Sequence, residues 1–295
     1  MERIEKFLQK REQDNLLRTL KPAAFRRGGL RYSKGREFID FSSNDYLGLC
    51  AHSELKKALK ETVDVLGVGS SASRLLSGDL DIYHELEAEV ARFKGKEKAL
   101  VFNSGYQANV GIISAFCRRG DAIFSDKLNH ASIIDGIILS GAKCFRFSHN
   151  DPGHLKQLLK KERAKFKEAL IITETVFSMD GDRPLLKELV GLAKSYNCKL
   201  MADEAHATGI FGRNGAGVVE EEALAGEVDL IMGTFSKALG SFGAYLASTS
   251  ETVEYLINAC RSFIYSTALP PSIIAANSVS LKLVKDESYR RKELL

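Results

Sequence analysis

The chain has 295 residues, of which 44% are hydrophobic and 27% are charged, and these are ordinary values for a folded globular protein. They exclude a disordered, collagen-like or coiled-coil chain, and the length favours one large domain with a smaller partner. The formal net charge of +4 is small, and basic residues are interspersed with acidic ones. The sequence therefore gives no indication of nucleic-acid binding.

Cysteine usage and the N-terminus bear on the compartment. The five cysteines are odd in number, widely spaced and free of C-x-x-C pairs, so neither a disulfide framework nor a metal site is indicated. Residues 1–18 are rich in Glu, Lys, Arg and Gln and lack the apolar stretch of a signal peptide. No apolar run is long enough to span a bilayer. We therefore expect a cytoplasmic protein with no membrane partner.

The first predicted elements are an amphipathic helix at residues 4–20 and a short strand at 37–41, which together form an arm. From residue 53 onward, helical patterns alternate with short apolar runs, which predicts helices that cover a mostly parallel sheet. The predicted strands are 98–102, 122–125, 143–147, 169–175, 199–203, 229–234 and 242–247. The predicted helices are 53–66, 82–94, 106–118, 132–139, 154–165, 185–196, 252–262 and 272–285. The short link between the last two strands is compatible with either a tight crossover or one antiparallel strand.

Polar residues follow several predicted strands, at the edge of a parallel sheet where ligands bind. NSGYQAN at 103–109 begins a helix and offers free backbone N–H groups to an anion, although the same composition also suits a simple turn and helix cap. The segment at 126–132 contains His130, and a lone histidine is more often structural than catalytic. The acidic stretch at 177–182 has the composition of a turn.

Two further strand ends carry residues that solvation does not explain. Asp203 ends a hydrophobic strand, where a carboxylate is costly to bury unless a cation meets it, and His206 follows three residues later. Lys237 lies between a buried strand and a glycine-rich turn. Partial burial and nearby cations lower the pKa of an amine, and the neutral amine can attack an aldehyde.

Four motifs, in this order, resemble those of the α-oxoamine synthase family of fold-type I pyridoxal 5′-phosphate (PLP) enzymes. They are SSNDYLGL at 42–49, DEAH at 203–206, TFSKALG at 234–240 and YSTALPP at 265–271. The resemblance covers nearly the whole chain. It implies a three-layer α/β/α PLP-dependent transferase fold with a mostly parallel sheet. It also implies an N-terminal arm with part of a small domain at 1–47, a large PLP-binding domain at 48–275, and the start of a truncated C-terminal small domain at 276–295.

The resemblance implies roles for residues in these motifs. Lys237 would hold PLP as a Schiff base and move the α-proton, Asp203 would pair with the pyridinium nitrogen, and His206 would hydrogen-bond the phenolic oxygen. His130 would stack on the ring. The other implied cofactor contacts are Gly105, Tyr106, Ser178, Thr234 and Ser236, with Ser266 and Thr267 reaching the phosphate of a neighbouring subunit in a homodimer. The implied substrate contacts are Arg18, Asn44 and His130.

The implied reaction is a decarboxylative condensation of an amino acid with an acyl thioester, here L-alanine with a pimeloyl thioester in biotin synthesis. One alternative is another member of the family with different substrates, such as 2-amino-3-oxobutyrate CoA ligase. A second is a PLP-binding fragment without turnover, because the family continues for a further subdomain that supplies a substrate-binding arginine. A serine hydrolase is disfavoured, since the chain has no G-x-S-x-G motif.

One loop departs from the family pattern. In GVGSSASR at 67–74, Ser71 and Ala72 stand where the family has two glycines. Because glycine tolerates backbone conformations that other residues avoid, we expect a less free backbone approach at this loop.

Overall fold

The computed structural model describes residues 2–295, and the chain divides into two compact units, Met1–Ser43 and Asn44–Leu295. The first unit contains helix α1 (Glu2–Gln13) and an antiparallel sheet in the order β1 (Phe25–Arg27), β2 (Leu30–Ser33) and β3 (Arg36–Ile39). The helix predicted at 4–20 is too long, because Asn15 has φ 56, a left-handed conformation that ends a helix. The strand predicted at 37–41 is one of three and ends at Ile39.

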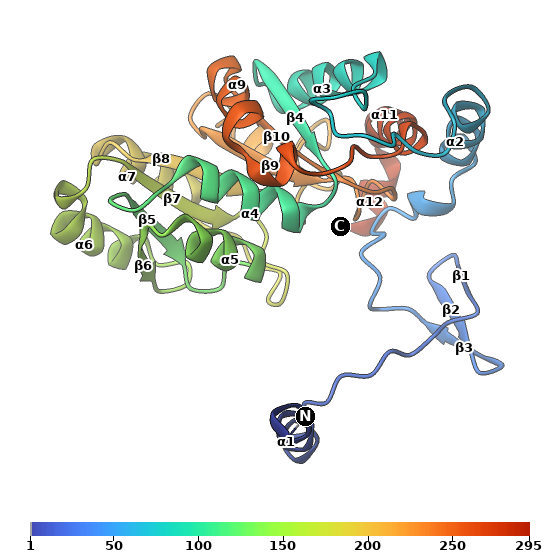
Figure 1. The fold of residues 1–295 in the computed structure, drawn as a ribbon, viewed down its shortest axis with the longest axis horizontal. Helices are drawn as coiled ribbons and strands as arrows, with labels where there is room; N and C mark the ends of the chain where they lie inside the picture. Colours follow the sequence, from blue (N-terminus) through green and yellow to red (C-terminus); the bar gives the residue numbers. More distant parts are fainter. Residues whose placement is uncertain (1) are drawn as a thin grey trace. The chain divides into compact units, whose positions relative to one another are not determined.

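The second unit is a seven-stranded sheet with helices on both faces (Figure 1). Its strands are β4 (Lys98–Phe102), β5 (Ala122–Asp126), β6 (Lys143–Phe147), β7 (Ala169–Glu174), β8 (Lys199–Asp203), β9 (Leu230–Thr234) and β10 (Ala244–Ser248). Its α-helices are α2 (Ser53–Leu66), α3 (Asp81–Lys94), α4 (Gly105–Phe116), α5 (Ala131–Ser140), α6 (Pro152–Glu162), α7 (Leu186–Ser195), α8 (Val218–Glu221), α9 (Ser250–Ala259), α10 (Arg261–Ile264), α11 (Pro271–Asp286) and α12 (Tyr289–Leu294). Two 3₁₀ turns are η1 (Leu49–Ala51) and η2 (Arg163–Lys165).

The strand order is β4-β10-β9-β8-β7-β5-β6. All neighbouring pairs from β9 to β6 are parallel, whereas β10 is antiparallel to both β9 and β4. Of the two arrangements that the short link between β9 and β10 allowed, the structure therefore contains the antiparallel one. Since β10 opposes both of its neighbours, β4 runs in the same direction as β9, and the carboxyl ends of β4, β5, β7, β8 and β9 lie along one edge.

The strands from β4 to β5 in this order are largely buried because each side packs against a helical layer, whereas the edge strand β6 exposes Lys143 and Arg146. In β4, Leu100 and Phe102 join a cluster with residues of α4, α5 and α9, while Ala99 and Val101 join a cluster with residues of α3 and α11. In β7 the side chains likewise alternate between the α4 and α5 side and the α6 and α7 side. This period of two in a fully buried strand produces the three layers.

Within residues 2–295, no helix is both long enough and apolar enough to cross a membrane.

Candidate active site

A cavity of about 230 Å³ opens at the carboxyl edge of the sheet. Its lining comes from the ends of β4, β5, β7, β8 and β9 and from the turns that follow them. The lining residues are Ser104, Gly105, Tyr106, Asn109, His130, Ser132, Glu174, Asp203, Ala205, His206, Met232, Thr234, Ser236 and Lys237. Chain segments more than 130 residues apart in sequence thus meet in one pocket.

Asp203 is held rigidly at the end of β8. It is 4% exposed, and its Oδ2 accepts a hydrogen bond from Asn109 Nδ2 at 2.8 Å. Its Oδ1 accepts the backbone N–H of Ala205 at 2.9 Å. Both of these donors are neutral, so the buried carboxylate is oriented without being neutralised. A cationic group bound in the pocket would supply the missing charge.

Lys237 and His206 form the second polar group of the pocket. Lys237 Nζ lies 2.7 Å from His206 Nε2, and the hydroxyl of Tyr46 lies 2.8 Å from His206 Nδ1. Burial lowers the pKa of Lys237, although Asp203 and Glu174 partly oppose this shift. Burial, Lys237 and His130 together lower the pKa of His206 to about 4. The pocket therefore favours a nucleophilic amine beside a neutral imidazole.

His130 caps helix α5 at another side of the pocket. Its Nδ1 accepts the backbone N–H of Ser132 at 3.2 Å, and its own backbone N–H donates to Glu174 Oε1 at 2.6 Å. Glu174 is buried at the end of β7. Burial, with the negative charge of Asp203 as a second cause, raises the pKa of Glu174 to about 8. At neutral pH this carboxyl group is therefore largely protonated.

The third part of the pocket suits an anion. Ser104 caps helix α4 by accepting the backbone N–H of Gln107 at 3.2 Å, which leaves other N–H groups of the first turn without intrahelical partners. Thr234 Oγ1 donates to the Gly243 carbonyl at 2.8 Å and lies 2.7 Å from Ser236 Oγ. A helix N-terminus with hydroxyl groups nearby is a typical phosphate site.

Two glycines show why distant motifs converge here. Gly240, in the turn after Lys237, has φ +64, and a Cβ at this position would lie 2.4 Å from the backbone N of Cys50. Gly209, after the DEAH motif, has φ +89, and its Cβ would lie 2.8 Å from Ala238 Cβ. Both contacts are too short for any other residue, so glycine permits the Lys237 turn to pack directly on its neighbours.

The remaining residues predicted for the site lie outside this pocket lining. Ser178 is exposed in the turn after β7, and Thr267 is exposed, with its carbonyl accepting Asn103 Nδ2 at 2.9 Å. Ser266 Oγ accepts Gln107 Nε2 at 2.6 Å. Asn44 contacts the Tyr46 hydroxyl, and Arg18 belongs to the first unit, which is described by itself. The roles predicted for these residues stay predictions.

The sequence analysis did not assign roles to two residues that shape the pocket. Asn109 points from the buried face of α4, and an amide among apolar helix neighbours was the signal that could have found it. Its Oδ1 is a buried oxygen without a hydrogen-bond partner among the described residues. Glu174 ends the run ALIITE beside Asp203, and a second acid at a parallel strand end was the corresponding signal.

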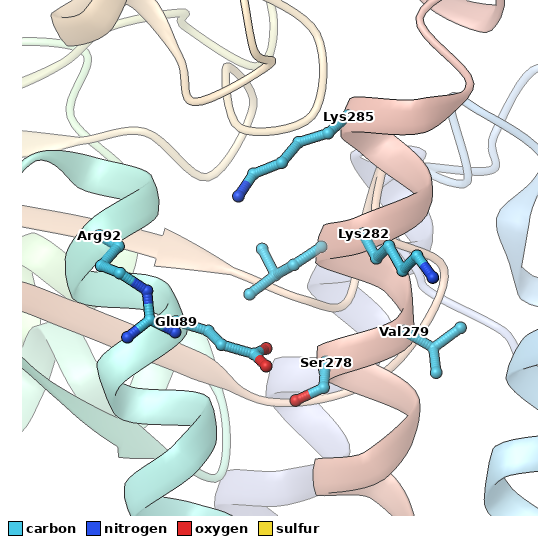
Figure 2. A pocket seen from close by; sticks show the side chains of 7 residues that line it. Glu89, Arg92, Ser278, Val279, Lys282 and Lys285 are labelled. Carbon is cyan, nitrogen blue, oxygen red and sulfur yellow. The ribbon is translucent and has the colours of Figure 1, made fainter.

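A second cavity lacks the residues expected of an active site. A cavity of about 410 Å³ between α3 and α11 is larger than the site, but its polar side chains come from Glu89, Arg92, Ser278, Lys282 and Lys285 on helix surfaces (Figure 2). None of the four motifs contributes to it. We therefore place the active site at the strand ends.

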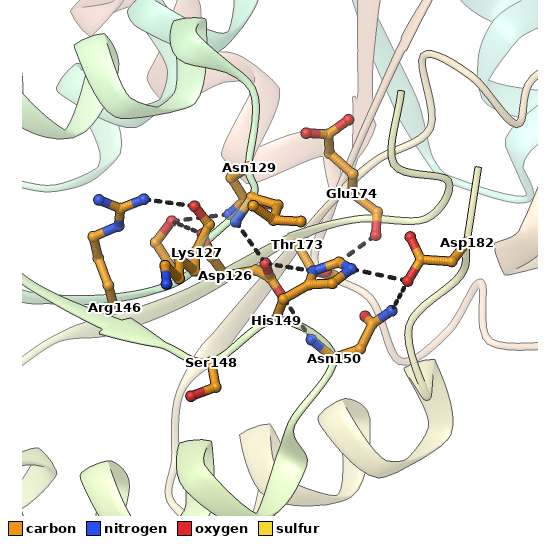
Figure 3. A network of polar contacts seen from close by, with 12 residues as sticks. Asp126, Lys127, Asn129, Arg146, Ser148, His149, Asn150, Thr173, Glu174 and Asp182 are labelled. Carbon is orange, nitrogen blue, oxygen red and sulfur yellow. Dashed lines mark hydrogen bonds and ion pairs between the residues drawn. The ribbon is translucent and has the colours of Figure 1, made fainter. Parts of the chain in front are cut away.

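A network of hydrogen bonds lies beyond β5 and β7 (Figure 3). His149 Nδ1 and Nε2 each lie 2.9 Å from a carboxylate, that of Asp126 and that of Asp182. Among the described residues, His149, Asp180 and Asp182 have potential ligand atoms within 4.8 Å of one another. Because Asp182 already engages the imidazole and Asp180 is exposed, we assign no metal to this group.

The chain matches the aminotransferase class I and II family over residues 36–295, which is most of its length. The chain belongs to this family. It is 50% identical over 277 residues to the 8-amino-7-oxononanoate synthase of Geobacter sulfurreducens, covering 94% of this chain and 71% of that protein. Other curated relatives at 49–51% identity are covered over 65–66% of their length.

Solved structures agree with this aminotransferase-family assignment. A serine palmitoyltransferase variant from S. paucimobilis with bound PLP-myriocin aldimine has a TM-score of 0.90 at 32% identity, covering 98% of this chain and 73% of that one. An 8-amino-7-oxononanoate synthase from Francisella tularensis has a TM-score of 0.74 at 35% identity, covering 85% and 70%. The chain thus spans 70–73% of the length of these two structures.

These comparisons confirm the predicted resemblance, the α/β fold of PLP-dependent transferases and the PLP cofactor. The pocket fits that cofactor on its own chemistry. Asp203 offers a buried negative charge for a cationic ring nitrogen, Lys237 offers an amine for an aldehyde, and the N-terminus of α4 offers N–H donors for a phosphate. A PLP-dependent enzyme of the aminotransferase family is therefore the assignment that sequence, fold and site share.

Proposed function

We propose that this chain catalyses the PLP-dependent decarboxylative condensation of L-alanine with a pimeloyl thioester, which gives 8-amino-7-oxononanoate, CO₂ and free thiol in biotin synthesis. The observation that carries the proposal is the meeting of the Lys237 amine and the buried Asp203 carboxylate in one pocket. The choice of substrates rests on the 50% identity to the synthase of Geobacter sulfurreducens.

Bound PLP supplies an electron sink that stabilises negative charge at the α-carbon of an amino acid. Asp203 would keep the ring nitrogen protonated, which the sink requires. His130 would pack on the ring face, and Thr234, Ser236 and the first turn of α4 would hold the phosphate.

Lys237 has two tasks that its lowered pKa serves. As a neutral amine it can bind the aldehyde of the cofactor, and after its release it can accept the α-proton of the amino acid. Asn44 and Arg18 would contact the substrates.

We also propose a homodimer in which Ser266 and Thr267 reach the cofactor phosphate of the neighbouring subunit. Support comes from the position of Thr267, which is exposed and whose carbonyl is tied to Asn103 at the start of the phosphate-binding turn. The reducing, cytoplasmic compartment that we propose is supported by the odd number and wide spacing of the five cysteines in the sequence.

Borohydride reduction with PLP, followed by peptide mapping, tests the cofactor assignment. We expect one labelled peptide, which contains Lys237, and no label in Lys237→Ala. Lys282→Ala is the matched control, because this lysine lines the cavity between α3 and α11 and should leave the labelling unchanged. Labelling of a different lysine in the native protein would refute the assignment.

Release of free thiol from acyl thioesters tests the reaction. L-Alanine with pimeloyl-CoA or a pimeloyl carrier protein should release thiol and CO₂ in equal amounts. The second candidate is a condensation that uses L-serine, since the serine palmitoyltransferase variant has the higher TM-score of the two structures compared. Turnover with L-serine and palmitoyl-CoA but not with L-alanine would replace our choice, and a labelled Lys237 without any turnover would indicate a cofactor-binding fragment.

A further inference from the structure

A continuous chain of hydrogen bonds connects the SSNDYLGL motif to Lys237. The Tyr46 hydroxyl donates to Asn44 Oδ1 at 3.1 Å and lies 2.8 Å from His206 Nδ1. On the other side of the imidazole, His206 Nε2 lies 2.7 Å from Lys237 Nζ. All four residues belong to the unit Asn44–Leu295. Tyr46 lies within the SSNDYLGL motif, but the sequence predicted no role for it.

Counting protons along this chain fixes the state of His206. Asn44 Oδ1 can only accept a hydrogen bond, and a phenol has one hydrogen, so a Tyr46 hydroxyl that donates to Asn44 accepts from His206 Nδ1. The lowered pKa of His206, about 4, leaves the imidazole with a single proton at neutral pH. With Tyr46 donating to Asn44, that proton lies on Nδ1, and the unprotonated Nε2 faces Lys237 as an acceptor.

We propose that Tyr46 is a positioning residue that fixes the tautomer of His206 and so presents Nε2 to Lys237 as a hydrogen-bond acceptor. The proposal rests on the proposed function only in taking Lys237 as the reactive amine.

The tautomer decides what the electron pair of Lys237 can do. A neutral amine has two hydrogens and one electron pair. With Nε2 as an acceptor, one N–H of Lys237 is engaged and the electron pair stays free to attack an aldehyde. With the proton on Nε2, the imidazole would donate to that same electron pair and occupy it. Tyr46 therefore acts on the reactivity of Lys237 through His206, without touching the amine.

A purely structural role for Tyr46 is the competing explanation. Its ring packs against the core cluster that contains Leu47 and Phe235. Tyr46→Phe retains this ring and removes only the hydroxyl. Asn44→Leu keeps the hydroxyl but removes its acceptor, so the phenol is released to donate to His206 Nδ1. The two variants separate packing from proton placement.

The test is ¹⁵N NMR of the cofactor-free protein labelled at its six histidines, with His206→Asn used to assign the His206 signals. We expect the native protein to carry the proton on Nδ1. In Asn44→Leu the proton should move to Nε2, and in Tyr46→Phe the two tautomers should be mixed. Tyr83→Phe is the matched control, because the Tyr83 hydroxyl contacts Ser70 instead of this chain, and it should retain the native tautomer.

A second readout is the rate at which the cofactor-free protein captures PLP, followed by absorbance. We expect Tyr46→Phe to slow capture by about two- to tenfold, the effect of losing one ordinary hydrogen bond. A native His206 with its proton on Nε2, or an unchanged tautomer in both Tyr46→Phe and Asn44→Leu, would overturn the inference. The NMR result does not involve the cofactor, so failure of borohydride to label Lys237 would reject the proposed function while leaving the tautomer assignment intact.

Discussion

Lys94 Nζ lies 2.7 Å from Glu204 Oε2, and the two side chains are only 1% and 0% exposed. Lys94 also donates to Thr208 Oγ1 at 3.0 Å and to the carbonyl of Ala216. Glu204 Oε1 accepts the backbone N–H of Val219 at 2.9 Å. The pair thus joins the end of α3 to the turn after β8, directly beside Asp203. This ion pair therefore holds the end of β8, which carries Asp203, the residue that would contact the cofactor ring.

The first prediction concerns this ion pair. Burial alone would lower the pKa of Lys94, but Glu204 raises it above its ordinary value, so the Lys94 amine stays protonated. Lys94→Met should therefore reduce the free energy of unfolding by about 3–5 kcal/mol, because Glu204 would remain as a buried, unpaired charge. Urea denaturation measures this loss. The second variant Lys94→Met/Glu204→Leu should recover part of it.

The control for this prediction is an exposed ion pair. Lys98 and Glu254 lie 3.5 Å apart with side chains 44% and 67% exposed. Lys98→Met should change the free energy of unfolding by less than about 1 kcal/mol. Equal losses of unfolding free energy in Lys94→Met and Lys98→Met would show that the buried ion pair stabilises the fold no more than the exposed one.

The second prediction concerns the pH dependence that Glu174 creates. Its pKa is raised to about 8 by burial and by Asp203, so the folded protein holds a proton that the unfolded chain loses near pH 4.5. The stabilising contribution is complete below the unfolded pKa and is lost as the pH rises through about 8. The difference in unfolding free energy between the native protein and Glu174→Gln should therefore change by up to about 1.4 kcal/mol per pH unit within this window.

Asp203→Asn is the partner variant for Glu174. Because the Asp203 charge contributes to the raised pKa of Glu174, removing that charge should move the pH window toward lower values. Urea denaturation of the cofactor-free protein at several pH values measures both variants. A pH profile that stays the same in Glu174→Gln would contradict the assignment. With the cofactor bound, Asp203→Asn should also lower the turnover number by about 10²–10³-fold, as the loss of a preorganised charge does elsewhere.

The large domain was predictable because most of its strands are buried on both faces. The apolar runs at 98–102 and 199–203 coincide with β4 and β8, because so short and apolar a run is typical of a covered strand. The run at 143–147 coincides with β6, although this edge strand exposes Lys143 and Arg146. The first helix was not predictable to its end. Its amphipathic pattern continues past Gln13, but the left-handed backbone of Asn15 stops it.

The site was predictable where one residue type has no other explanation. An aspartate at the end of a buried strand and a lysine before a glycine-rich turn both indicated chemistry, and both line the pocket. Asn109 and Tyr46 were not predictable in their roles, because these depend on which side chains meet across the fold. A hydrogen bond between residues 94 or 160 positions apart leaves no local pattern in the sequence.

The third prediction concerns the backbone of Ser71. Ser71 has φ 55, in the left-handed region that disfavours most residues other than glycine and asparagine. Ser71→Gly should raise the free energy of unfolding by about 0.5–1 kcal/mol by relieving this strain. The control is Ser278→Gly in the middle of α11, which should lower it by about 0.5 kcal/mol. Destabilisation by both substitutions would mean that the Ser71 backbone is not strained.

The fourth prediction concerns the network of Figure 3, in which His149 lies between Asp126 and Asp182. The ring of His149 also meets that of Phe177 edge-on, at 4.4 Å between centroids. His149 therefore secures the turn at 177–182 after β7, where Ser178 was predicted to reach the cofactor. Burial lowers the pKa of His149, but the hydrogen bonds to the two carboxylates more than offset this effect, and the pKa is raised.

A raised histidine pKa stabilises the folded protein at low pH. The contribution of His149 is complete below about pH 6.5, where the unfolded imidazole is also protonated, and it is lost as the pH rises through the higher folded pKa. The advantage of the native protein over His149→Gln should therefore shrink as the pH rises above 6.5 in urea denaturation. Asp182→Asn removes one carboxylate, so an NMR titration should show a lower pKa for His149. If Asp182→Asn leaves the pKa of His149 unchanged, the contact between His149 and Asp182 does not stabilise the charged imidazole, and this prediction is wrong.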